Sequence, residues 1–162
     1  MKKVFIVSFL FASITGEAQI KGFSLGPYIE AGWPAGNLQE TNKNGIGAGL
    51  GADIRLGKLG LTGSAGYMHF GGKTIDKGDG LVKMPAVNAM PIRVGIKYRL
   101  FPSVYAKLES GVAKFTGGDE SALIISPGIA IRLLGFELQG KYEIWNRNES
   151  LSFWGLKAGI NF

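Results

Sequence analysis

The chain has 162 residues, a formal net charge of +6 and no cysteine, and 26 of its residues are glycine. Its length fits one domain, and the lack of cysteine excludes a disulfide scaffold and thiol chemistry. The positive charges do not gather in one exposed stripe, so the composition argues against nucleic-acid binding.

Residues 1–18 have the pattern of a secretory signal peptide. Two lysines at positions 2 and 3 precede an apolar run over residues 4–14, and small residues follow up to Ala18. The run is too short for a helix that spans a membrane. We therefore expect export, cleavage after Ala18, and a mature domain that comprises residues 19–162.

The mature chain continues with eight segments in which alternate positions are apolar. In chain order they span residues 23–31, 46–56, 59–67, 92–100, 104–112, 123–133, 136–144 and 154–162. None of these apolar positions holds Asp, Glu, Lys, Arg or His. Alternation with a period of two predicts strands, and eight such strands predict an all-β fold.

The opposite positions of the same segments carry a set of charged side chains. The set comprises Glu30, Asp53, Arg55, Arg93, Lys97, Arg99, Lys107, Glu109, Arg132, Glu137, Lys141, Glu143 and Lys157. Such positions face water in a soluble barrel or sandwich, whereas they face the lumen in a membrane barrel. Many glycines share these positions, and a narrow eight-stranded lumen has room for few side chains. The glycines therefore favour the membrane barrel, with the charges inside.

The links between the segments alternate in length. The short links are residues 57–58, 101–103 and 134–135, and the long ones are residues 33–45, 70–91, 114–122 and 145–150. This rhythm is typical of outer-membrane barrels, which have short periplasmic turns and longer extracellular loops. We expect aromatic girdles at both rims. The periplasmic one would contain Phe23, Phe101, Phe136 and Phe162, and the outer one Trp33, Tyr67, Phe70, Phe115, Trp145 and Trp154.

These features predict an eight-stranded antiparallel up-and-down transmembrane β-barrel. The pattern resembles the OmpA/OmpX-like eight-stranded outer-membrane barrel domains over the whole mature chain. The last ten residues, FWGLKAGINF, are similar to the assembly signal of that group. The resemblance implies that Trp154, Ile160 and Phe162 are read by the barrel-assembly machinery, and it implies a location in the bacterial outer membrane. Pro27 and Pro127 lack the N–H that a central strand needs, so we expect β-bulges at both.

The thirteen charges can be interpreted in two ways. Paired ions could fill the lumen and tie opposite strands together, or the same groups could line an ion path. The narrowness of an eight-stranded barrel favours the filled lumen. We therefore expect a structural or surface-interaction protein, monomeric, whose loops contact lipopolysaccharide or external ligands within outer-membrane lipid. No cofactor or metal is predicted, because the Asp76–Gly80 segment lacks the further carboxylates of a calcium site.

Two other functions remain open from the sequence. An enzyme that modifies lipid A, as a deacylase or acyltransferase, would need a base and a nucleophile at the outer rim. His69 is the only histidine, and Ser121 and Ser150 are the candidate nucleophiles. A soluble periplasmic lipocalin-like binder would instead turn the apolar positions toward a ligand cavity.

Overall fold

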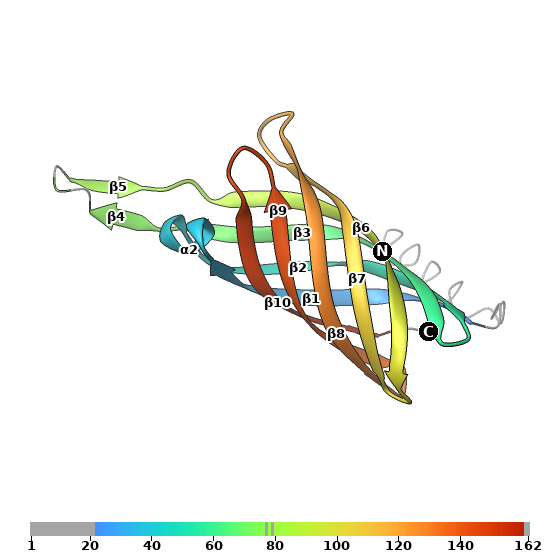
Figure 1. Cartoon of the computed structure of the whole chain (residues 1–162). Coiled ribbons are helices and arrows are strands. Elements are labelled where there is room, and N and C mark those ends of the chain that lie inside the picture. The colour runs from blue at the N-terminus through green and yellow to red at the C-terminus, as the bar shows by residue number, and fades with distance from the viewer. Residues whose placement is uncertain (1–21, 77, 79, 161–162) are drawn as a thin grey trace, which may run out of the picture.

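Eight long strands pair with their neighbours along the chain, and the first also pairs with the last, so the sheet closes on itself (Figure 1). The computed structural model describes residues 22–76, 78 and 80–160. All pairings are antiparallel, in the order β1-β10-β9-β8-β7-β6-β3-β2. The predicted transmembrane β-barrel is confirmed. The expected signal peptide and Phe162 lie outside the described residues.

The barrel strands correspond to the eight predicted segments and extend several of them. They are β1 (Phe23–Ala35), β2 (Asn42–Leu56), β3 (Leu59–Gly72), β6 (Val87–Phe101), β7 (Val104–Phe115), β8 (Ser121–Leu133), β9 (Phe136–Asn146) and β10 (Leu151–Ile160). Most of the additional length lies at the end with the long links, which we call the loop end. The opposite end, where residues 57–58, 102–103 and 134–135 connect the strands, is the turn end.

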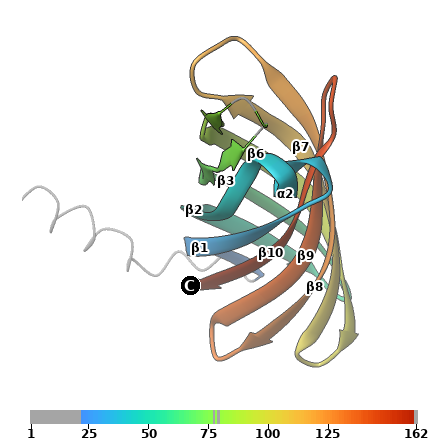
Figure 2. The same ribbon diagram turned by 90° about the vertical axis from the view of Figure 1, so that its left-hand side faces the viewer.

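Two small elements lie at the loop end. The helix α2 (Asn37–Thr41) lies between β1 and β2, and the strands β4 (Thr74–Asp76) and β5 (Leu81–Lys83) form a separate hairpin between β3 and β6. Figures 1 and 2 show both at the same end of the barrel. In the described part of the chain, no helix has the length and apolarity required to cross a membrane.

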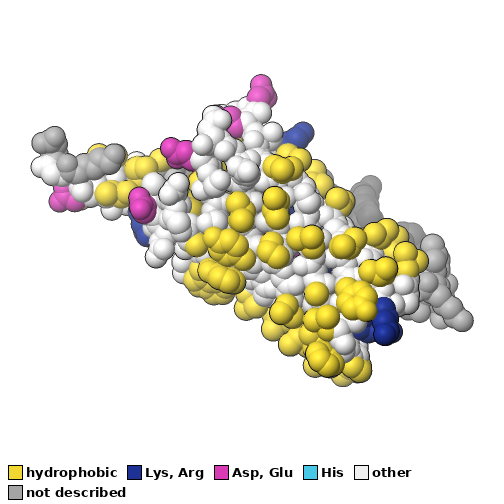
Figure 3. Space-filling model, in the orientation of Figure 1, with side chains coloured by type: hydrophobic (Ala, Val, Ile, Leu, Met, Phe, Trp, Pro, Cys, Tyr) yellow, Lys and Arg dark blue, Asp and Glu magenta, His cyan; other side chains and the backbone are white. Residues whose placement is uncertain are grey.

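The outer surface of the barrel is apolar. Ile46, Ile29 and Val94 are 71%, 68% and 64% exposed, and apolar side chains cover the face in Figure 3. The alternate positions of the same strands point inward and are mostly buried. This arrangement argues against the lipocalin-like binder, because the apolar side chains of such a protein would surround an internal ligand. It fits a barrel whose outside contacts lipid.

The bulges expected at Pro27 and Pro127 are absent from the register. The pairing of β1 with β2 passes through Pro27 without a shift. The pairing of β8 with β9 omits Ser126 and Pro127 and then resumes in the same register. The prediction was wrong because a missing N–H requires a gap in one ladder but no inserted residue. The register shifts lie instead at residues 42–45 and 99–101.

Candidate functional site in the lumen

Two buried ion clusters occupy the lumen at different depths. The upper cluster, nearer the loop end, consists of Glu30, Arg93, Lys141 and Glu143. Arg93 Nη2 lies 2.7 Å from Glu143 Oε1, and Arg93 Nη1 lies 3.4 Å from Glu30 Oε2. Lys141 Nζ lies 2.8 Å from Glu30 Oε1 and 2.6 Å from Glu143 Oε2. Each ion therefore meets two of opposite charge, and the cluster ties β1, β6 and β9 together across the barrel.

The lower cluster, nearer the turn end, consists of Asp53, Lys97, Lys107, Arg132 and Glu137. Asp53 Oδ2 accepts from Lys97 Nζ at 2.9 Å and from Arg132 Nη2 at 2.7 Å. Glu137 Oε1 lies 2.8 Å from Lys107 Nζ, and its Oε2 lies 3.4 Å from Arg132 Nε. The cluster links five strands, because each member comes from a different one.

A middle layer of polar side chains separates the two clusters. Gln139 donates to Glu109 Oε2 at 2.7 Å, and Lys157 Nζ lies 4.0 Å from the centroid of the Tyr28 ring. Gln139, Tyr28 and Ser126 were not among the predicted site residues. They share the inward positions of the charged set, so the alternation itself was the signal that could have identified them.

Arg55 and Arg99 do not belong to the buried clusters, although both were predicted to be in the lumen network. The other eleven predicted residues are inward-facing and at least largely buried, whereas Arg55 and Arg99 are exposed. Each lies within two residues of the strand's end at the turn end. No further layer of described side chains covers them there, which leaves both arginines exposed.

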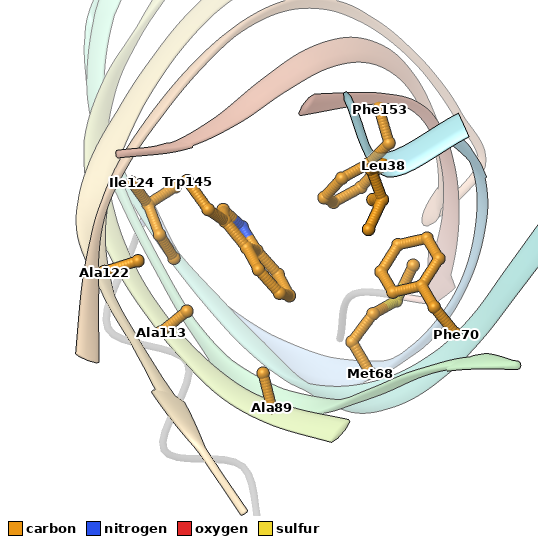
Figure 4. Close-up of a cluster of buried hydrophobic side chains, with 9 residues drawn as sticks. All are labelled: Leu38, Met68, Phe70, Ala89, Ala113, Ala122, Ile124, Trp145 and Phe153. Atoms are coloured by element: carbon orange, nitrogen blue, oxygen red, sulfur yellow. The ribbon is translucent and has the colours of Figure 1, made fainter. Parts of the chain in front are cut away.

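The loop end of the lumen is filled by an apolar plug that the sequence analysis missed (Figure 4). Its buried members are Leu38, Met68, Phe70, Ala89, Ala113, Ala122, Ile124, Trp145 and Phe153. Three rings pack edge to face, with centroid distances of 5.1 Å for Phe70–Phe153 and 5.4 Å for Trp145–Phe153. Leu38 comes from α2, so the first loop contributes directly to the plug.

A hydrogen bond joins the plug to the upper cluster. The indole N–H of Trp145 donates to Glu143 Oε1 at 2.6 Å. Trp145 thus satisfies its only polar group on the charged side and presents its apolar rings to the plug. The apolar side chains of the plug and the ions of the upper cluster therefore follow one another without a break along the barrel axis.

Glycines on the inner face make room for these large side chains. A Cβ atom at Gly45 would lie 2.5 Å from the Phe70 ring, and one at Gly49 would lie 2.7 Å from Tyr28 Cζ. Since Cβ atoms are not found at such distances, a side chain at either position would displace the ring. The glycine-rich inward positions therefore follow from packing in a narrow lumen.

Three aromatic residues were assigned wrongly to the outer girdle. Phe70 and Trp145 are fully buried in the plug, and Phe115 packs against it from β7. The error arose because aromatics near the loop end were interpreted without regard to which face of the strand they occupy. Trp33, Tyr67 and Trp154 do lie on the outside.

His69 and the two serines are not brought together. His69 faces outward on β3, where its Nδ1 contacts Asn88 Oδ1. Ser121 begins β8, which is separated from β3 by β6 and β7, and Ser150 bonds to Asn146 in the link before β10. Among the described residues, no contact joins His69 to either serine, so this arrangement offers no assembled pair of these residues as base and nucleophile.

Asp76 ends β4, and Gly78 and Gly80 lie between β4 and β5. Asp76 Oδ1 accepts a hydrogen bond of 3.0 Å from the N–H of Gly78. The carboxylate is therefore engaged in the turn itself. In the described part of the chain, no group of three acidic or histidine side chains is placed to hold a metal ion.

The closed antiparallel sheet, the apolar exterior and the ion-filled interior define an eight-stranded transmembrane β-barrel. No protein-family model and no curated protein matches the chain. Solved structures do. The crystal structure of Ail of Yersinia pestis has a TM-score of 0.59 and 19% identity, covering 88% of this chain and 100% of that one.

Two further structures share the fold. Ail of Yersinia pestis in complex with the heparin analogue sucrose octasulfate has a TM-score of 0.53 and 20% identity, covering 87% of this chain and 97% of that one. The N-terminal barrel domain of Pseudomonas aeruginosa OprF has a TM-score of 0.56 and 12% identity, covering 86% and 97%. At these identities the likeness establishes the fold. The predicted resemblance to eight-stranded outer-membrane barrels is confirmed at that level.

Proposed function

We propose that this protein is a non-conducting outer-membrane barrel whose loop end makes surface contacts with lipopolysaccharide or other anionic glycans. The observation that carries the proposal is the contrast between a filled lumen and a projecting hairpin. Ail, a barrel of the same fold, has been solved with a sulfated heparin analogue, which supports anionic glycans as the class of ligand.

The closed lumen supports the non-conducting role. Trp145, Phe70 and Phe153 are fully buried across the loop end, and ten of the inward charges behind them are buried as well. An ion would have to displace the packed rings and then break ion pairs in both clusters. The barrel should therefore give no steady conductance in a planar bilayer, and a stable open level in the wild-type protein would contradict the proposal.

The β4–β5 hairpin supports the surface role. Leu81 is 77% exposed and Val82 is 43% exposed, on strands that extend beyond the barrel rim (Figure 1). An isolated two-stranded hairpin in water is marginally stable, so contact with an external surface would stabilise it. Lys83, also exposed, adds a positive charge beside these apolar side chains.

Binding to the loop end can be measured with the barrel in nanodiscs and purified lipopolysaccharide or sucrose octasulfate as the probe. Replacing residues 74–83 by a short Gly-Ser linker should weaken binding at least tenfold, whereas Lys58→Gln at the turn end should leave it unchanged. Equal affinity with and without the hairpin would contradict the role given to it.

Location and assembly can be tested in cells. The protein should fractionate with the outer membrane and change its gel mobility on boiling; a freely soluble protein would contradict a membrane role. On β10, Trp154 and Ile160 lie on the same outward-facing set of positions as Leu156. If the barrel-assembly machinery reads this strand together with Phe162, Phe162→Ser should lower the folded fraction, and wild-type levels would show that Phe162 is not read.

The alternative function, an enzyme that modifies lipid A, can be tested at His69, its candidate base. His69→Ala should leave the lipid A profile unchanged, since in the described part of the chain neither candidate serine lies beside His69. A deletion phenotype in the acyl pattern of lipid A that His69→Ala reproduces in a folded protein would establish the enzyme instead.

A further inference from the structure

A small cavity lies beside the lower cluster. Its volume is about 20 Å³, and its polar lining residues are Tyr28, Asp53, Thr62, Lys107, Glu137 and Lys157. A cavity of this size holds about one water molecule or one small ion. Because several cations lie beside the cavity, the net charge around it determines whether a water molecule or an ion is the favoured occupant.

The lumen charges do not balance around this cavity. Within the described residues, six inward cations face five carboxylates: Arg93, Lys97, Lys107, Arg132, Lys141 and Lys157 against Glu30, Asp53, Glu109, Glu137 and Glu143. The upper cluster is neutral, with two ions of each sign. The excess positive charge therefore lies in the lower half of the lumen, where the cavity is. A buried charge without a counter-ion is unfavourable in a low-dielectric interior.

Lys157 is the cation that lines the cavity without a direct ion pair, although Glu109 of the middle layer is near enough to attract its ammonium group. In the part of the chain that the structure describes, its ammonium group forms no ion pair within 4.0 Å; it lies over the Tyr28 ring instead. The two carboxylates that line the cavity are paired with cations other than Lys157. Asp53 is bound by Lys97 and Arg132, and Glu137 by Lys107.

The turn end is also positive outside the cavity. Arg55, Lys58 and Arg99 are exposed there, and the described residues of this end expose no acidic side chain. The acidic side chains visible in Figure 3 lie toward the loop end. A surface of one sign around a low-dielectric opening concentrates ions of the opposite sign. Anions are therefore attracted to the end of the barrel at which the cavity lies.

We propose that the lower lumen binds one small monovalent anion, such as chloride, beside the ammonium group of Lys157. The hydroxyl of Thr62 and the ammonium of Lys107 line the same cavity as further donors. The anion brings the lumen to neutrality. The rival occupant is a water molecule that would donate to Asp53 Oδ1, which has no donor among the described residues.

The test measures the unfolding of the mature barrel in zwitterionic micelles at constant ionic strength. Replacing sodium isethionate by sodium chloride should raise the unfolding midpoint, because an anion that binds only the folded state stabilises it in proportion to the logarithm of its concentration above the dissociation constant. Constant ionic strength removes the general effect of screening.

Matched variants separate the site from solvent effects. Lys157→Gln should abolish the chloride-specific rise, and Lys58→Gln, which removes an exposed turn-end cation, should retain it. An absent rise in the wild-type protein, or an equal rise in Lys157→Gln, would overturn the proposal. Should Lys157→Gln fail to fold, crystals of the wild-type barrel grown with sodium bromide decide the question: an anomalous peak in the cavity supports the anion, and density without bromide signal establishes water alone.

Discussion

Different kinds of side chain fill the two ends of the lumen. At the loop end, aromatic and aliphatic side chains pack together, and one of them, Leu38, belongs to a loop helix. Toward the turn end, ion pairs connect strands across the barrel and involve no loop. The difference shows that one narrow barrel can be filled by apolar packing at one end and by paired charges at the other.

The consequence for stability differs between the two regions. Losing one member of an ion pair leaves its partner buried and unpaired, whereas trimming an apolar side chain leaves a cavity that neighbours can partly fill. The charged region should therefore be the less tolerant of single substitutions. The apolar plug should instead couple the barrel to the conformation of its first loop.

Arg93→Met gives the largest expected effect. It leaves Glu30 and Glu143 with Lys141 as their remaining cation, and removing one partner of a buried pair costs about 3–5 kcal/mol. Urea unfolding of the barrel in phospholipid vesicles measures the change. Arg99→Met is the matched control, because Arg99 is exposed at the turn end and should alter stability by less than about 0.5 kcal/mol. Similar losses in both variants would show that the upper cluster does not stabilise the barrel.

Ile96→Arg tests what allows the barrel to tolerate a charged side chain: its depth in the membrane, or the face of the strand that carries it. Ile96 is 53% exposed on the outer surface, and its neighbour Lys97 is buried inside at the same depth. An arginine on the lipid face near the midplane costs about 2–4 kcal/mol, although the next residue carries a charge in the wild type. The unfolding free energy in vesicles measures this, with Ile96→Leu as the control. A harmless Ile96→Arg would mean that this face does not contact lipid.

Leu38→Ala tests the coupling between the plug and the first loop. Leu38 is fully buried although the helix that carries it has only five residues, so its loss should cost about 2 kcal/mol. We expect the cost to appear locally, as faster amide exchange over residues 36–42, while the barrel strands stay protected. Gln39→Ala, at an exposed position of α2, should leave exchange unchanged. Uniformly faster exchange in all strands would show that the plug is part of the barrel's global stability.

The sequence predicted the barrel well because alternation and link length are local properties of the chain. Charge-free outward positions and short turns such as residues 57–58 can be recognised without knowing any contact. The inward direction of Glu143 and Lys141 followed from the same period of two. Which ions pair with which did not, because Arg93 and Glu143 are fifty positions apart and meet only across the closed lumen.

The apolar plug was missed for a related reason. Aromatic residues near a strand end are typical of a girdle, and Trp145 was assigned to one although it continues the inward positions of Lys141 and Glu143. Strict use of the alternation would have placed it inside. The contribution of Leu38 is different: α2 is a short loop helix without a side-chain cap, and nothing local indicates that it docks on the barrel.

The smallest expected effect concerns the turn end, in the two-residue turn between β8 and β9. Leu134 has φ 49° and is followed by Gly135 with φ 85°, and Leu134 is 99% exposed. A left-handed conformation costs a residue with a Cβ atom about 1–2 kcal/mol, whereas Asn-Gly is favoured in two-residue hairpin turns of this kind. Leu134→Asn should therefore raise the unfolding free energy by about 1 kcal/mol. Leu133→Asn, one residue earlier in the extended strand, relieves no such strain and removes an outward apolar side chain, so it should lower stability. Stabilisation by both substitutions, or by neither, would show that backbone conformation does not limit this turn.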